Sequence, residues 1–127
     1  MPVIRRTFTI NNTDMTIYIS LPISGYDLNE RRRLADAARH HLLAENPEAE
    51  VVTPFDISDR VEVMNPAAGY ADYMKEDIAF ILELADAVCF LVNPRLTGSK
   101  GVKLEYQAAR IYGKRIMRLA VRMAKVL

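Results

Sequence analysis

Two acidic residues fall within the apolar stripes of two predicted helices, where a charged side chain is costly. In the segment 101–112, a helical period of about 3.6 residues places Glu105 on the apolar side. In the segment 67–85, the same period places Asp77 among tyrosines, Met74 and aliphatic residues. An ionised carboxylate in such a setting costs several kcal/mol unless it is paired, hydrogen-bonded or protonated. Either local partners such as tyrosine hydroxyls satisfy each acid, or the two acids form a site.

A pair of acids in a cleft of low dielectric constant suits one kind of chemistry in particular. Burial and mutual repulsion separate their pKa values, so that one acid stays charged while the other keeps its proton. Cleavage of a glycosidic bond needs both forms, because one carboxylate attacks or stabilises the anomeric carbon and the other protonates the leaving group. Glu105 and Asp77 are therefore candidates for such a pair.

The elements that must position these acids alternate along the chain. We predict helices at 29–46, 67–85 and 101–112, and a long connection without a clear period at 56–66. The predicted strands are 15–20, 50–55, 86–92 and 114–121. This order predicts one α/β domain over residues 1–127, with a doubly wound parallel sheet covered by helices on both faces. The segment 7–19 is also compatible with a hairpin turning at Asn11-Asn12, which would add an antiparallel edge strand.

Three segments are expected at the ligand-binding edge of this sheet. Ligands of doubly wound folds bind outside the carboxyl ends of the strands, where the strand order reverses. The loop 21–27, the segment after Phe55 and the loop 93–100 each follow a predicted strand there. Glycines flank Ser99 directly before a helix N-terminus, which favours an anion such as phosphate. Ser24-Gly25 is a similar feature, although glycine-serine loops are more often simple turns.

Composition narrows the class of protein. The formal net charge of +1 argues against nucleic acid or a membrane surface as the main partner, and no segment approaches the roughly 18–20 apolar residues of a membrane span. The only cysteine, Cys89, lies in an apolar strand. A single cysteine excludes a disulfide framework and favours a reducing, cytoplasmic compartment.

Adjacent His40 and His41 point about 100° apart on a helix and cannot easily share a metal. No metal or cofactor is expected, since a GxGxxG dinucleotide motif is also absent.

Three segments carry a resemblance to a known family. They are IYISLPISG (17–25), KEDIAFILELADAVCFLV (75–92) and GSKGVKLEYQAA (98–109), which contains a G-x-x-x-E pattern. Over about residues 15–118 the chain resembles the nucleoside 2-deoxyribosyltransferase-like superfamily, which includes the deoxynucleoside 5'-monophosphate N-glycosidases. The resemblance implies a flavodoxin-like α/β fold, a tyrosine at the end of the first strand, and a nucleophilic glutamate four residues after a glycine.

The resemblance also implies roles for individual residues. Glu105 would be the nucleophile, Asp77 the acid that protonates the departing base, and Tyr18 a residue that orients Glu105 or contacts the sugar. The residues expected to bind substrate are Ser20, Ser24, Gly25, Gly98, Ser99 and Gly101. Leu21 and Gln107 stand where many members have glycine, and they are expected to add bulk near the site or its supporting backbone.

These features favour an enzyme that cleaves or exchanges the N-glycosidic bond of a nucleoside or nucleoside 5'-monophosphate. Two alternatives come from other classes of protein. A nucleotide- or nucleotide-sugar-binding module without turnover is motivated by Leu21 and Gln107, and a structural or assembly protein by the apolar tail 116–127. The tail, and the neighbouring subunit's residue that characterised relatives use, also predict a homodimer or larger homo-oligomer.

Overall fold

The chain folds into alternating strands and helices, as a computed structural model shows for residues 15–23, 25–93, 99–122 and 125–126. The helices are α2 (Leu28–Glu45), α3 (Pro54–Met64), α4 (Tyr70–Glu83) and α5 (Lys100–Ile111). The strands are β1 (Thr16–Ser20), β2 (Glu50–Val52), β3 (Ala87–Val92), β4 (Arg115–Arg122) and β5 (Lys125–Val126). The turn of the predicted N-terminal hairpin, at Asn11-Asn12, lies outside the described residues.

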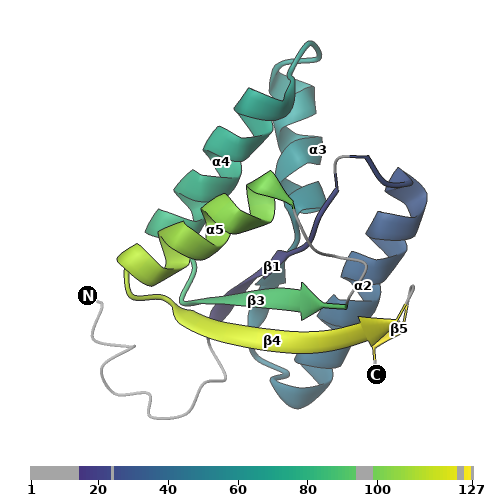
Figure 1. Ribbon diagram of the computed structural model, residues 1–127, viewed down its shortest axis with the longest axis vertical. Helices are drawn as coiled ribbons and strands as arrows, with labels where there is room; N and C mark the ends of the chain where they lie inside the picture. Colours follow the sequence, from purple (N-terminus) through teal and green to yellow (C-terminus); the bar gives the residue numbers. More distant parts are fainter. Residues whose placement is uncertain (1–14, 24, 94–98, 123–124, 127) are drawn as a thin grey trace.

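The strands form one sheet in the order β2-β1-β3-β4-β5. Strands β1 to β4 pair in parallel, as predicted, and β5 adds a short antiparallel pairing to β4. The strand order reverses between β1 and β3, which is where doubly wound folds bind their ligands. Helix α2 covers one face of the sheet, and α3, α4 and α5 lie on the other (Figure 1).

Helix α3 was not predicted from the sequence. Hydrogen bonds at its N-terminus explain why a helix forms where a strand end and a connection were expected. The strand expected at 50–55 ends at Val52, and the connection expected at 56–66 is largely helical. The Thr53 side chain accepts from the Asp56 N–H at 3.3 Å, while the Asp56 carboxylate accepts from the Thr53 N–H at 2.9 Å. Pro54 occupies the first turn, where its missing N–H needs no partner. These local interactions outweigh the strand preference of the segment.

Helix α4 begins three residues later than the predicted start at 67. The Asp72 carboxylate accepts from the Gly69 N–H at 2.9 Å and so fixes the first turn at Tyr70. This side chain satisfies one of the N–H groups that a helix start leaves without an intrahelical partner.

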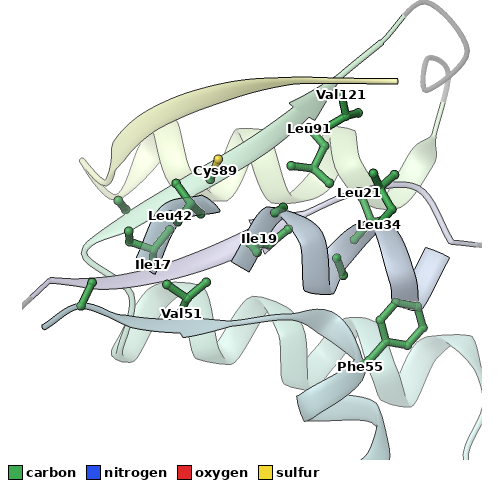
Figure 2. Packing of buried hydrophobic residues seen from close by; sticks show 14 of the residues in the cluster. Ile17, Ile19, Leu21, Leu34, Leu42, Val51, Phe55, Cys89, Leu91 and Val121 are labelled. Atoms are coloured by element: carbon green, nitrogen blue, oxygen red, sulfur yellow. The ribbon is translucent and has the colours of Figure 1, made fainter. Parts of the chain in front are cut away.

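Two apolar cores lie on opposite faces of the sheet. Side chains of β1, β2 and β3 meet α2 on one face, where Ile17, Ile19, Leu42 and Cys89 are buried together (Figure 2). Burial raises the pKa of the Cys89 thiol to about 12, so this cysteine is an inert part of the core. On the other face, Val88 packs with side chains of α4 and α5.

In the part of the chain that the structure describes, no helix combines the length and apolar character needed to cross a membrane.

Candidate active site

A cavity of about 540 Å³ opens at the carboxyl ends of β1 and β3. The loop after β1, the start of α2 and one side of α3 form part of its wall, and α4 and the first turns of α5 form the rest. Its lining residues are Leu21, Ile23, Tyr26, Leu28, Arg32, Pro54, Phe55, Ser58, Glu62, Tyr70, Tyr73, Met74, Asp77, Ser99, Lys100, Gly101, Val102 and Glu105. The cavity therefore lies where the reversal of strand order predicts a ligand, and both candidate acids line it.

Glu105 is held in place by two hydroxyl groups from β1. Tyr18 Oη donates a hydrogen bond to Glu105 Oε2 at 2.8 Å, and Ser20 Oγ donates one to Oε1 at 2.7 Å. Because side chains two residues apart on a strand point to the same face, the pleat of β1 aims both donors at α5. Only 4% of Glu105 is exposed. Each carboxylate oxygen thus has one fixed donor and a lone pair left over.

The surroundings of Glu105 shift its pKa toward neutral pH. Burial raises the pKa of Glu105 to about 7, and the hydrogen bonds from Ser20 and Tyr18 oppose that rise. The pKa of Tyr18 lies well above its usual value, first because it is buried and then because of the negative charges of Glu105 and Asp77. Tyr18 therefore remains a protonated donor whenever Glu105 is ionised.

Asp77 reaches the same cavity from α4, although only 6% of the residue is exposed. Its pKa is raised to about 8, first by burial and then by the negative charge of Glu105, while the hydrogen bond with Tyr18 opposes the rise. Asp77 Oδ1 has no hydrogen-bond partner within the described structure. Two acids from different helices thus meet one cavity, and the more strongly shifted acid has an oxygen free to hold or donate a proton.

The predicted substrate-binding residues occupy different places around this pair. Ser99 and Gly101 line the cavity, and the Ser99 hydroxyl also caps α5 by accepting from the Val102 N–H at 3.2 Å. Ser20 does not line the cavity, since it is buried behind Glu105 and donates to it. Gly25 is exposed, away from the lining, and its φ of 86° serves a turn. Ser24 and Gly98 lie outside the described residues.

Leu21 and Gln107, the two positions that depart from the superfamily pattern, lie in different parts of the structure. Leu21 is buried and lines the cavity, as expected for a residue that adds bulk near the site. Gln107 is exposed on α5 and lines a different, second cavity. Gln107 thus does not line the first cavity, although it belongs to the helix that carries Glu105.

The segment after Phe55 was expected at this edge as a loop, and the lining residues that it supplies from α3 were not predicted. Phe55 and Ser58 line the cavity, and so does Glu62, which accepts a hydrogen bond from Tyr73 Oη at 3.0 Å. Arg32 lies over the Phe55 ring at 4.6 Å and pairs with both carboxylate oxygens of Asp59, at 3.1 and 2.7 Å. The Thr53-Pro54-x-Asp56 capping pattern was the available signal, since it announces a helix start at the edge of the sheet.

No group of three or more His, Cys, Asp or Glu residues within the described ranges is arranged to hold a metal ion.

Comparison with solved structures defines the class of fold. The structure is similar to that of the 2-desoxiribosyltransferase from Leishmania mexicana, with a TM-score of 0.56 and 22% sequence identity. The match covers 85% of this chain, which spans 65% of the length of that structure. The chain therefore has the predicted nucleoside 2-deoxyribosyltransferase-like fold.

The family is defined by the sequence. Residues 15–118 match the model of the domain of unknown function DUF4406, and the chain belongs to that family. Among curated proteins, no sequence gives a significant match to the chain.

Proposed function

We propose that this protein cleaves or exchanges the N-glycosidic bond of a nucleoside or nucleoside 5'-monophosphate, with Glu105 as nucleophile and Asp77 as acid. The observation that carries the proposal is the different setting of two buried acids at one cavity. Both oxygens of Glu105 accept hydroxyl hydrogen bonds, whereas Asp77 Oδ1 has no partner among the described residues. The two hydroxyl donors favour the ionised form of Glu105, whereas burial and the negative charge of Glu105 raise the pKa of Asp77 and favour its protonated form.

The first half-reaction breaks the bond between sugar and base. A Glu105 carboxylate oxygen forms a bond to the anomeric carbon while the carbon–nitrogen bond breaks. The electron pair of that bond stays on the base, which takes the proton from Asp77. The products are a neutral glycosyl ester on Glu105, the free base and an ionised Asp77.

The second half-reaction releases the sugar. Water, or the N–H of a second base, attacks the anomeric carbon and gives its proton to Asp77. The ester bond breaks, and its electron pair restores the Glu105 carboxylate. Attack by water gives hydrolysis, and attack by a second base gives transfer.

The remaining wall offers places for the rest of such a substrate. Phe55, Tyr70 and Tyr73 provide aromatic surface for a base, and Ser99 and Lys100 at the N-terminus of α5 suit a 5'-phosphate. Tyr18 and Ser20 position the nucleophile from behind. The volume of about 540 Å³ lies within the range of about 300–1,000 Å³ that is common for small-molecule sites.

Chromatographic detection of free base tests the proposal. Wild type, Glu105→Ala and the exposed α4 control Glu83→Ala are incubated with ribo- and deoxyribonucleosides and their 5'-monophosphates. We expect base release by wild type and the control, and none by Glu105→Ala. Equal release by Glu105→Ala would remove Glu105 from the mechanism.

A nucleotide-binding module without turnover is the second candidate, favoured by Leu21 in the cavity wall. Its large side chain forms part of the wall of the cavity that Glu105 also lines, at a position where many superfamily members have glycine. Calorimetry would then show saturable nucleotide binding by wild type, with no product after long incubation. Base release by Leu21→Gly but not by wild type would show that Leu21 blocks an otherwise complete site.

A further inference from the structure

A second cavity, of about 350 Å³, lies between α5 and the strands β3 and β4. Its lining residues are Phe90, Val102, Lys103, Tyr106, Gln107 and Arg118. The Phe90 and Tyr106 rings meet edge to face with their centroids 5.5 Å apart, which gives the cavity an aromatic wall. Neither Glu105 nor Asp77 lines this cavity, so the mechanism proposed above makes no use of it.

The cavity lies in a strongly cationic part of the chain. Between Lys100 and Arg122, every charged residue is a lysine or arginine except the buried Glu105. The net charge of +1 conceals this asymmetry, because acidic residues elsewhere in the chain offset it. Among the described residues, no salt bridge joins a cation of α5 or β4 to a carboxylate.

Two of these cations, Arg110 and Arg118, lie beside Tyr106. Arg110 Nη1 donates to Tyr106 Oη at 3.2 Å, and the guanidinium carbon lies 5.8 Å from the ring centroid. The hydrogen bond and charge of Arg110, together with the charge of Arg118, lower the pKa of Tyr106. Because these cations form no salt bridge with any carboxylate of the described residues, they are available to an anion from outside the molecule.

We propose that this second cavity, which shares only Val102 with the lining of the first, binds a nucleoside phosphate at a site distinct from the acid pair. The Phe90 and Tyr106 rings provide apolar surface for a base, and the Gln107 amide provides both a donor and an acceptor for its polar edge. Lys103 and Arg118 provide the charge for a phosphate. The same chemistry is offered by a free nucleotide and by a single strand of nucleic acid, whose bases stack on aromatic side chains along a cationic groove.

Counting binding events per chain separates this site from the first one. Isothermal titration uses 5'-AMP with Glu105→Gln, which prevents turnover, as the parent protein. Adding Lys103→Ala and Arg118→Ala should abolish one binding event per chain or weaken it at least ~10-fold. Adding Lys75→Ala, an exposed cation on α4, should leave every event unchanged. The single change Lys103→Glu, at an exposed position, should weaken the same event by repelling phosphate.

Two further probes define the ligand. Ribose 5-phosphate, which lacks the base, should bind this site at least ~10-fold more weakly than 5'-AMP if the aromatic wall holds a base. A single-stranded oligothymidylate that binds more tightly than 5'-AMP, with a steep loss of affinity in salt, would identify a nucleic-acid strand. Weaker binding of the oligonucleotide would identify a free nucleotide.

Two outcomes would overturn the proposal. One is the same number and strength of 5'-AMP events in the Lys103→Ala, Arg118→Ala protein and the Lys75→Ala control, with both proteins folded by circular dichroism. The other combines two results. The parent protein is a dimer in sedimentation velocity that the Lys103→Ala, Arg118→Ala protein alone fails to form, and the parent protein shows no binding of 5'-AMP that these two substitutions remove. That second outcome would assign this surface to another copy of the chain.

Discussion

The two faces of β1 perform different tasks. Toward α2, Ile17 and Ile19 enter a wholly apolar cluster (Figure 2). Toward α5, the intervening residues Tyr18 and Ser20 present hydroxyl groups to a buried carboxylate. One face thus buries apolar surface, whereas the other removes a potential charge from water. The period of two along a strand separates a stabilising core from a candidate reactive site within five residues.

This difference predicts opposite responses to substitution. Removing apolar groups on the α2 face loses transfer free energy and leaves a void. Removing an acid on the other face relieves the cost of burying a charge, while any chemistry that needs the acid is lost. The two faces are therefore distinguishable by measuring stability and base release on the same variants.

The largest effect is expected for Glu105→Gln. If the proposed mechanism holds, loss of the nucleophile lowers the rate of base release by at least ~10³-fold. The amide has nearly the same shape, and both hydroxyl partners are able to accept as well as donate, so the fold should survive. Chromatographic rates and urea denaturation of the same preparation measure both properties.

Glu83→Gln is the matched control for this prediction, because Glu83 is an exposed acid near the end of α4. Retention of full activity by Glu105→Gln would show that the buried acid is merely a satisfied core group.

A core truncation on the other face should show the reverse pattern. Leu42 of α2 is 2% exposed and belongs to the apolar cluster, so Leu42→Ala should lower the free energy of unfolding by about 2–5 kcal/mol. Base release per folded molecule should change little well below the melting temperature. Urea denaturation at 25 °C measures the loss, and an activity loss without a stability loss would contradict the separation of the two faces.

The pH dependence of stability should reveal the buried acids. Both pKa values are raised by folding, to about 8 for Asp77 and about 7 for Glu105, so the native state binds more protons than the unfolded state above about pH 4. Their contribution is fully present below that pH and declines as pH rises to about 8. Asp77→Asn should therefore stabilise the protein at pH 8–9 by about 1–3 kcal/mol and flatten the decline, as thermal unfolding across pH would show.

Asp59 provides a control, because its pKa shifts in the opposite direction from those of Asp77 and Glu105. The Arg32 hydrogen bond lowers its pKa, so its contribution is present above its unfolded pKa and is lost as pH falls. Asp59→Asn should thus leave the decline above pH 5 unchanged. An equal flattening by both substitutions would mean that the slope reports general charge repulsion rather than the buried acids.

Much of this arrangement was predictable from the sequence. Apolar strands alternating with helices predicted the parallel sheet, and the helical period predicted that Asp77 and Glu105 lie on the buried sides of α4 and α5. Both predictions succeed because each depends on one element at a time. The period of a helix decides which side chains point inward, whatever the partner elements are.

The parts that were not predictable depend on contacts between elements. Helix α3 has few buried side chains, so its period is weak, and only the Thr53-Asp56 capping pattern marked its start. The placement of Ser20 behind Glu105, instead of in the cavity wall, follows from how closely α5 packs against β1. Sequence spacing carries no information on such distances between segments more than 80 residues apart.

Gly101 gives the smallest expected effect and tests how closely α5 packs against α4. A Cβ there would lie 3.3 Å from Met74 Sδ and 3.4 Å from Tyr70 Oη. Both are ends of long side chains that are able to move, and alanine is the better helix former, so Gly101→Ala should change stability by less than ~0.5 kcal/mol. Because Met74 and Tyr70 line the cavity, their displacement should raise KM roughly 2- to 10-fold with little change in kcat. Gly69→Ala, where a Cβ meets open space, is the control, and an equal change in KM for both variants would contradict the predicted role of this contact.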